Sequence, residues 1–231
     1  MRDGPISSSA RLAVVCDFDG TITEEQTGRA LLDAFAPPAW RTLAPPTASF
    51  TPAAAQDLTS AQFSLVRGSE TEVRRWVATR AADVPLRPGI HPFLAWCATQ
   101  EVPVTIASAG IDLYVHPILE AAHLRVTDVR CGRSTWTATG LNISFDHLLS
   151  ADFPGERDIK RLAVLSAQAG GHFVVLVGDG PGDLPAAEVA DLVLARDELV
   201  AFVRNRGITH REFTDFTDVV KAVGGLTGRQ S

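Results

Sequence analysis

Two aspartates that stand two residues apart, Asp17 and Asp19, are the residues of this chain best placed to do chemistry. They follow an apolar run at residues 12–16 and precede Gly20-Thr21, a pattern typical of a buried parallel strand that ends in a turn. Residues at the carboxyl end of such a strand face the crevice in which open α/β sheets bind ligands. Because a buried carboxylate is costly without a compensating cation, the pair indicates nucleophilic, acid–base or metal chemistry. The simpler alternative is a helix-capping aspartate beside a solvated one.

Two later apolar runs also end in polar residues. The run at 102–107 is followed by Ser108, and the run at 173–177 leads to Asp179 and Asp183. If these runs are parallel strands of one sheet, their carboxyl ends bring the polar side chains to the same edge as the first two aspartates. Four carboxylates at one edge repel one another unless a divalent cation lies among them. Ligands that are all oxygen atoms favour Mg²⁺.

Lys160 is one of only two lysines in the chain. It stands near the start of a predicted helix at 157–169, where a positive charge opposes the helix macrodipole. A structural reason for a lysine there is weak, so we expect Lys160 to supply positive charge to the acidic edge and to a bound phosphate. Arg157 and Arg161 are nearby competitors for this role, and a solvated surface lysine is the simpler alternative.

Ser108 is followed by Ala109 and Gly110, which we interpret as a strand-to-helix turn. The serine hydroxyl and the two backbone N–H groups are suited to binding phosphate oxygens. The alternative is that Ser108 only caps the helix predicted from Asp112.

The chain divides into two parts with different patterns of predicted secondary structure. Residues 22–86 contain helical patterns and no strand alternation, with a Pro- and Ala-rich loop or broken helix at 36–55. From Pro88 onward, strands alternate with helices, which predicts an α/β fold with a doubly wound parallel sheet. We therefore expect a catalytic core of residues 10–21 and 87–231 and a small helical cap of residues 22–86. Helices that simply pack on the sheet are the alternative.

The expected elements are as follows. Helices are predicted at 24–35, 56–66, 70–82, 91–100, 112–123, 157–169, 198–205 and 216–223. Strands are predicted at 12–16, 102–107, 126–130, 173–177 and 192–194, with a small hairpin formed by 134–138 and 141–145.

Composition narrows the class of protein. The 231 residues carry a net charge of −6, are 45% hydrophobic and are 21% charged, which fits a globular protein and argues against a sequence-independent nucleic-acid binder. The three cysteines lack metal-type spacing and suggest reduced thiols. We see neither a signal peptide nor a membrane-spanning run. We expect a cytoplasmic protein, monomeric or homodimeric, that binds neither nucleic acid nor membranes.

The order of these features resembles that of a known family. Residues 17–21, Ser108, Lys160 and the segment 178–183 are similar to the four motifs of the haloacid dehalogenase-like phosphatases. The resemblance spans residues 12 to about 223. It implies a Mg²⁺-dependent hydrolase that acts on a small phosphorylated metabolite.

The resemblance also implies roles for individual residues. Asp17 and Asp179 would supply side-chain oxygens to the metal, and Asp19 its backbone carbonyl. Asp17 would attack phosphorus to give an aspartyl-phosphate. Asp19 would protonate the leaving alcohol and later deprotonate the attacking water. Asp183 would hold a metal-bound water or orient Lys160.

The branch of the family is indicated by other segments. The helical insert resembles that of phosphoserine phosphatases, and residues 190–199 and 213–216 resemble the methionine-salvage keto-methylthiopentenyl phosphate phosphatases. Phosphoserine phosphatases carry a glutamate and an asparagine where this chain has Gln26 and Gly182, so phosphoserine is disfavoured as the substrate. A neutral Gln26 suits the hydroxyl or carbonyl groups of a polyol, sugar or keto-alkyl phosphate. Arg67 is a candidate for binding a substrate carboxylate or second phosphate, or is an exposed arginine at a helix end.

Two other functions use a similar scaffold. A phosphotransferase or phosphomutase would pass the phosphoryl group to an acceptor other than water. A signalling receiver, phosphorylated on aspartate, also has a parallel sheet, acids and a lysine, but such modules are about half this length. A dehalogenase would not need Asp19 as an acid or the pair Asp179 and Asp183.

Overall fold

The computed structural model describes residues 11–43 and 52–227, and these residues form a seven-stranded sheet. The strand order is β4-β3-β2-β1-β5-β6-β7, and neighbours are parallel except for the antiparallel pair β3 and β4. The strands are β1 (Arg11–Cys16), β2 (Val104–Ile111), β3 (Asp128–Thr137), β4 (Gly140–Ser144), β5 (His172–Gly178), β6 (Leu192–Ala195) and β7 (His210–Glu212). The order runs outward on both sides of β1, so the predicted doubly wound α/β class is confirmed.

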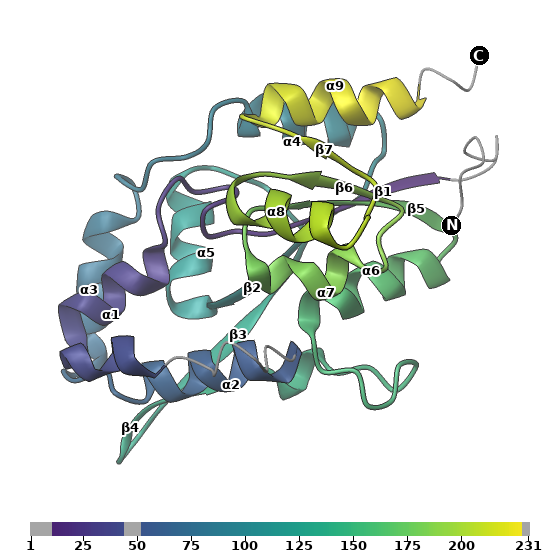
Figure 1. The fold of residues 1–231 in the computed structure, drawn as a ribbon. Helices are drawn as coiled ribbons and strands as arrows, with labels where there is room; N and C mark the ends of the chain where they lie inside the picture. The colour runs from purple at the N-terminus through teal and green to yellow at the C-terminus, as the bar shows by residue number, and fades with distance from the viewer. Residues whose placement is uncertain (1–10, 44–51, 228–231) are drawn as a thin grey trace.

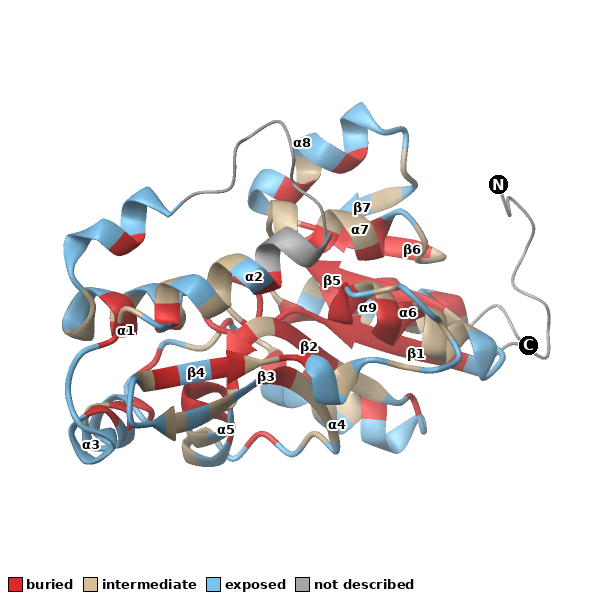
Figure 2. Cartoon of the chain, turned by 90° about the horizontal axis from the view of Figure 1, so that it is seen from below, coloured by how far each residue is buried: buried red, intermediate tan, exposed pale blue. Residues whose placement is uncertain are grey.

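Helices cover both faces of the sheet, with α4 and α9 above it and α6 and α7 below it in Figure 1. Alternate strand residues point to opposite faces. Val14 and Val175 join one buried cluster with α4, α5 and α9, and Val15 and Leu176 join another with α6, α7 and α8. The helices are α4 (Ile90–Thr99), α5 (Asp112–Ala121), α6 (Ile159–Ala169), α7 (Leu184–Ala187), α8 (Asp197–Asn205) and α9 (Phe216–Thr227). Two apolar layers therefore bury the central strands, which are red in Figure 2.

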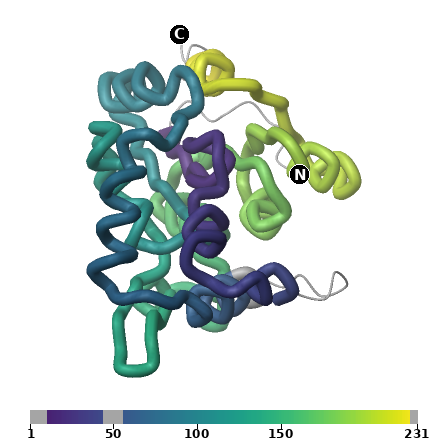
Figure 3. The backbone as a smooth tube through the Cα atoms, turned by 90° about the vertical axis from the view of Figure 1, so that its left-hand side faces the viewer, coloured from purple at the N-terminus to yellow at the C-terminus, as the bar shows by residue number. Residues whose placement is uncertain are grey.

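A helical segment stands between β1 and α4. It consists of α1 (Thr27–Phe35), the 3₁₀ helix η1 (Pro38–Thr42), α2 (Pro52–Phe63) and α3 (Glu70–Arg80). Its two ends are joined by an antiparallel bridge between Thr23 and Leu86, and the Arg87 N–H donates to the Ile22 carbonyl at 2.8 Å. Helices α1 and α3 lie side by side at one end of the molecule (Figures 1 and 3). The bridge stands at the predicted boundary, and the division into a core and a cap domain stays a prediction.

The described buried residues of this segment pack into the core of the sheet and do not form a separate apolar interior. Leu31 of α1, Phe63 of α2 and Val73 of α3 belong to the same buried cluster as Val14 of the central strand. Among the described residues, no helix is both long and apolar enough to cross a membrane.

The structure corrects the sequence prediction at β3 and β7. The predicted strands at 126–130 and 134–138 are one continuous strand that passes through Gly132. A Cβ at Gly132 would lie 2.7 Å from the Phe145 ring, so the absence of a side chain there leaves room for the ring. The edge strand β7 was not predicted because its residues, His210, Arg211 and Glu212, are polar and carry no apolar signal.

Several element boundaries also differ. Strand β2 runs to Ile111, so Ser108, Ala109 and Gly110 lie within the strand and not in the predicted turn after it. Helix α1 begins at Thr27 rather than at residue 24, because the residues before it form the bridged connection to Leu86. Helix α2 begins at Pro52 instead of at 56, since proline is tolerated in a first helical turn. The predicted loop at 36–55 contains η1, and its residues 44–51 lie outside the described part of the chain.

Candidate active site

A cavity of about 370 Å³ opens at the carboxyl ends of β1, β2 and β5 and is lined on its other side by α1 and α2. Its lining includes all of the predicted site residues except Arg67, namely Asp17, Asp19, Gln26, Ser108, Ala109, Gly110, Lys160, Asp179 and Asp183. The fold thus brings together residues that are up to 166 positions apart in the sequence, from Asp17 to Asp183. Parallel strands that end at one edge account for this convergence.

Lys160 is buried between two of these aspartates. Its Nζ atom lies 2.7 Å from Asp17 Oδ1 and 2.6 Å from Asp183 Oδ1. The lysine is the second residue of α6, which starts at a cap formed by Asp158, whose side chain accepts the Arg161 N–H at 2.6 Å. The cap fixes the first turn of α6 and so directs Lys160 toward the end of β1.

The negative charge at this edge exceeds the positive charge. Burial and the charge of Asp183 raise the pKa of Asp17 well above its usual value, against the opposing effect of Lys160. Burial and Asp183 also raise the pKa of Asp179. Burial disfavours a charged Lys160, but the carboxylates of Asp17 and Asp183 outweigh it and raise its pKa. A single lysine therefore does not offset the carboxylates around it.

Three of the carboxylates could hold a metal ion. One oxygen each from Asp17, Asp179 and Asp183 lies within 4.8 Å of the others. Their oxygen-only chemistry and surplus negative charge fit a hard divalent cation such as Mg²⁺. Thr21 Oγ1 donates to Asp179 Oδ1 at 3.0 Å and orients that side chain.

Asp183 already has partners for both of its oxygens. Oδ1 pairs with Lys160, and Oδ2 accepts the N–H groups of Asp179 and Gly180 at 3.0 and 3.1 Å. Of the two roles considered for Asp183, the structure contains the contact that orients Lys160, and the same side chain fixes the loop that carries Asp179.

Gly20 allows the loop after β1, which carries Asp19, to lie against the Asp179 side chain after β5. Its φ is +84°, and a Cβ at this position would lie 2.3 Å from Asp179 Oδ2 and 2.6 Å from Gln26 Nε2. Only glycine combines this backbone conformation with so close an approach. The glycine after Asp19 is thus required by the geometry of the acidic edge.

Asp19 is held from two sides. Its Oδ2 accepts a hydrogen bond from the Tyr114 hydroxyl at 2.6 Å, and its Oδ1 accepts the Thr27 N–H at 2.8 Å. The backbone carbonyl of Asp19 accepts Gln26 Nε2 at 3.2 Å. Burial raises the pKa of Asp19 to about 6, against the hydrogen bonds from Tyr114 and Thr27 that lower it.

Ser108 lies where β2 departs from regular pairing with β3, in a register shift between Ala107 and Ile111. Its side chain is 1% exposed, and its Oγ accepts the Gly110 N–H at 2.9 Å. The irregularity presents the Ser108 hydroxyl and the following residues, Ala109 and Gly110, to the cavity.

The helical segment contributes both polar and apolar residues to the cavity wall. These residues are Gln26, Gly28, Arg29, Leu32, Thr59, Gln62 and Phe63. Arg67 is exposed and is not among the cavity residues. Its backbone N–H donates to the Phe35 carbonyl at 2.7 Å. The arginine that lines the cavity is Arg29, which the sequence analysis did not select.

Tyr114 was also missed. It is the only tyrosine of the chain, and it lies on the first turn of the helix that follows Ser108. Its position after a strand-end motif was the available signal, but nothing local indicates that its hydroxyl meets Asp19, 95 residues earlier.

Comparisons with known proteins agree with this geometry. Residues 14–188 match the family model of the haloacid dehalogenase-like hydrolases. A 2-hydroxy-3-keto-5-methylthiopentenyl-1-phosphate phosphatase of Geobacillus kaustophilus is 31% identical over 216 residues, covering 92% of this chain and 96% of the relative. An enzyme of the same name from Brevibacillus brevis is 27% identical over 215 residues, covering 92% and 95%.

A similar fold is found among solved structures. The apo form of a phosphoserine phosphatase superimposes with a TM-score of 0.67 at 15% sequence identity, covering 91% of this chain and 98% of the other. At 15% sequence identity, this similarity is evidence for a shared fold alone.

Proposed function

The chain belongs to the haloacid dehalogenase-like hydrolases and is a phosphatase, and from this premise we propose that it hydrolyses the phosphomonoester of a small metabolite through a phosphorylated Asp17. The contact that supports this most is the buried pair of Asp17 and Lys160 at the mouth of β1. In this proposal one oxygen of Asp17 attacks phosphorus, the bond to the leaving oxygen breaks, and water then releases phosphate from the carboxyl group.

Charge neutralisation is the main requirement of phosphoryl transfer, because little of the acceleration comes from covalent help. We assign the metal site to Asp17, Asp179 and the Asp19 carbonyl, with Asp183 beside them. Bound Mg²⁺ would neutralise charge on the phosphoryl group. Lys160 would also bind phosphate oxygens, since its ammonium group can donate three hydrogen bonds and two aspartates take two of them.

Ser108 and the backbone N–H group of Ala109 are proposed to bind the remaining phosphate oxygens. The Ser108 hydroxyl already accepts the Gly110 N–H, so its own proton is available to an acceptor in the cavity. This arrangement orients the phosphoryl group toward Asp17.

Asp19 is proposed as the acid that protonates the leaving oxygen and as the base that deprotonates water in the second step. It lines the same cavity as Asp17 and follows it by two residues, so both side chains can reach one bound phosphomonoester.

The substrate class is proposed from the opposite wall. Gln26 and Arg29 offer hydrogen-bond donors, and Leu32 and Phe63 offer apolar contact. Donors of this kind suit a keto- or hydroxyalkyl phosphate, and the names of the relatives describe a substrate with hydroxy and keto groups.

The experiment that tests the proposed reaction is the variant Asp17→Asn with p-nitrophenyl phosphate as substrate. Wild type is expected to release inorganic phosphate without any acceptor, and D17N to lose at least about a thousandfold in kcat, since removal of a nucleophile is among the largest catalytic losses. The exposed Asp152 lies outside the cavity, and D152N is the matched control that is expected to keep full activity. Activity retained by D17N overturns the assignment, and nitrophenol release that requires an added alcohol and yields the phosphate ester of that alcohol instead of inorganic phosphate indicates a phosphotransferase.

A further inference from the structure

We infer that Tyr114 is a positioning residue for Asp19, whose carboxyl group it holds in place for the transfer of a proton to the leaving oxygen. The inference rests on the proposed function, in which Asp19 is the general acid. It adds a residue from α5 to a site otherwise built from the ends of strands, the connection to α1 and the start of α6.

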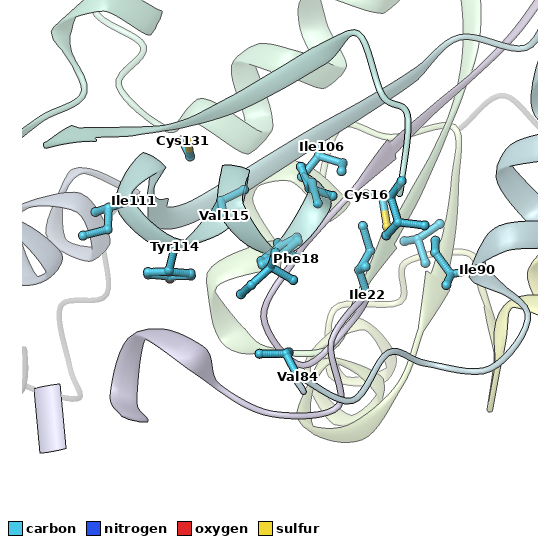
Figure 4. Close-up of a cluster of buried hydrophobic side chains, with 14 of the residues drawn as sticks. Cys16, Phe18, Ile22, Val84, Ile90, Ile106, Ile111, Tyr114, Val115 and Cys131 are labelled. Atoms are coloured by element: carbon cyan, nitrogen blue, oxygen red, sulfur yellow. The ribbon is translucent and has the colours of Figure 1, made fainter. Parts of the chain in front are cut away.

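The contact between the two side chains is short and buried. The Tyr114 hydroxyl donates to Asp19 Oδ2 at 2.6 Å, and the tyrosine is 1% exposed. Figure 4 shows the ring among Ile111, Val115 and Phe18. A ring fixed in this way fixes the position of its hydroxyl oxygen, and the hydrogen bond then restrains Asp19 Oδ2.

Two glycines leave room for the same hydroxyl. A Cβ at Gly110 would lie 2.0 Å from the Tyr114 oxygen, and a Cβ at Gly28 would lie 2.9 Å from it. Neither glycine has a positive φ, so the backbone conformation does not require glycine at either position. Gly28 is also the second residue of α1, where alanine is the better helix former by up to about 1 kcal/mol. The space for the phenol therefore explains both glycines.

Two hydrogen bonds hold the carboxyl group of Asp19, one from the Tyr114 hydroxyl to Oδ2 and one from the Thr27 N–H to Oδ1. Without the bond from Tyr114, the carboxyl group can rotate about its terminal torsion, which is broad for aspartate, and turn away from the leaving oxygen. As the bond from phosphorus to the leaving oxygen breaks, the O–H bond of Asp19 breaks and the proton goes to that oxygen. In the second step, a proton from water returns to the Asp19 carboxylate.

The test compares two esters of similar size in the variant Tyr114→Phe. Benzyl phosphate has a basic alkoxide leaving group that needs a proton, whereas p-nitrophenyl phosphate has a weakly basic leaving group that needs little help. The parameter to compare is kcat/KM, which reports the steps up to formation of the phosphorylated enzyme. We expect kcat/KM of Y114F to fall by about 10- to 100-fold for benzyl phosphate, part of the usual general-acid contribution, and by less than about 3-fold for the nitrophenyl ester.

A second variant keeps the test decisive if the ring itself is needed for folding. Gly28→Ala places a methyl group against the hydroxyl, and we expect the same selective loss for benzyl phosphate. In the double variant G28A/Y114F the oxygen is gone, the next atom of the ring lies 3.5 Å from the Cβ, and the loss is expected to equal that of Y114F alone. Thr105→Val is the matched control: it removes a hydroxyl bonded to Asp128 at 2.8 Å outside the cavity, and its ester preference is expected to be that of wild type.

Equal losses on both esters in Y114F, or additive losses in the double variant, overturn the inference. The proposed function is judged separately, by phosphate release in wild type and its loss in D17N. A Tyr114 that proves purely structural would therefore leave the nucleophile assignment intact.

Discussion

The Lys160 ammonium group lies 2.7 Å from Oδ1 of Asp17, and both side chains are almost fully buried. Lysines are rarely buried unless they are paired, and this one occupies the point where β1 and α6 converge. The pair accounts for both the stability and the proposed chemistry of the site.

Removal of the buried Lys160 ammonium group is expected to destabilise the folded state as well as to slow the reaction. Lys160→Met leaves Asp17 and Asp183 without their partner, which costs about 3–5 kcal/mol in comparable buried pairs. The free energy of unfolding in urea measures this cost. The only other lysine, Lys221, is exposed and distant from the cavity, so K221M serves as the control and is expected to unfold like wild type. Equal stability of the two variants would show that the pair is not stabilising.

Metal binding is expected to raise the melting temperature. A divalent cation relieves the repulsion among Asp17, Asp179 and Asp183, and it binds only the folded state, so saturating Mg²⁺ is expected to raise Tm by a few degrees. The shift is read by calorimetry in EDTA and in Mg²⁺, without substrate. Asp179→Asn is expected to reduce the shift strongly, while D152N keeps it. A wild-type Tm that does not respond to Mg²⁺ argues against the metal site.

Asp158 is expected to make stability depend on pH. Burial raises its pKa from 3.8 to about 6 against the opposing Arg161 N–H bond, so the folded state holds its proton more tightly than the unfolded state does. The stability that Asp158 contributes is therefore complete below about pH 4 and is lost as the pH rises through about 6. Asp158→Asn still caps α6 and does not titrate.

The measurement is the difference in the free energy of unfolding between D158N and wild type. This difference is expected to move in favour of the variant by up to about 3 kcal/mol between pH 4 and pH 7. A difference that is constant over this range, or that moves in favour of wild type, contradicts the assignment.

Arg29 is expected to recognise the part of the substrate beyond the phosphate. Its neighbour one helical turn later, Asp33, pairs with Arg41 and accepts the Trp40 Nε1–H at 3.1 Å, so it does not draw Arg29 away from the cavity. Arg29→Met is expected to raise KM for keto- or hydroxyalkyl phosphates about 10-fold or more, in line with the loss of a charged hydrogen bond, and to leave phenyl phosphate nearly unchanged. R67M is the control, because Arg67 lies outside the cavity. Equal effects of the two substitutions would exclude Arg29 as a specificity residue.

Much of the site followed from the sequence because its residues stand directly after apolar strands. Asp17, Ser108 and Asp179 could be placed at one edge of a sheet from periodicity and strand order alone. Lys160 was suggested by its helix position, and the structure adds its partners. The strand-end rule does not apply to Tyr114 or Arg29, which lie on helices and meet the cavity only through tertiary packing.

The strands differ in the same way in how far the sequence predicts them. The buried strands carry continuous apolar runs and could be predicted, whereas β7 is polar and is a strand only because β6 offers a free edge. The strand predicted at 126–130 and the first strand of the hairpin predicted at 134–138 are one strand, β3, and the role of Gly132 within it, admitting the Phe145 ring, depends on a side chain from another segment.

The central assignment is that Asp17 carries the phosphoryl group during turnover, and mass spectrometry of acid-quenched enzyme tests it most directly. After rapid mixing of wild type with p-nitrophenyl phosphate, we expect one phosphoryl group on the peptide that contains Asp17, absent in D17N and still present in Y114F. A phosphoryl group on another residue, or turnover with no phosphorylated peptide at any mixing time, would contradict the mechanism.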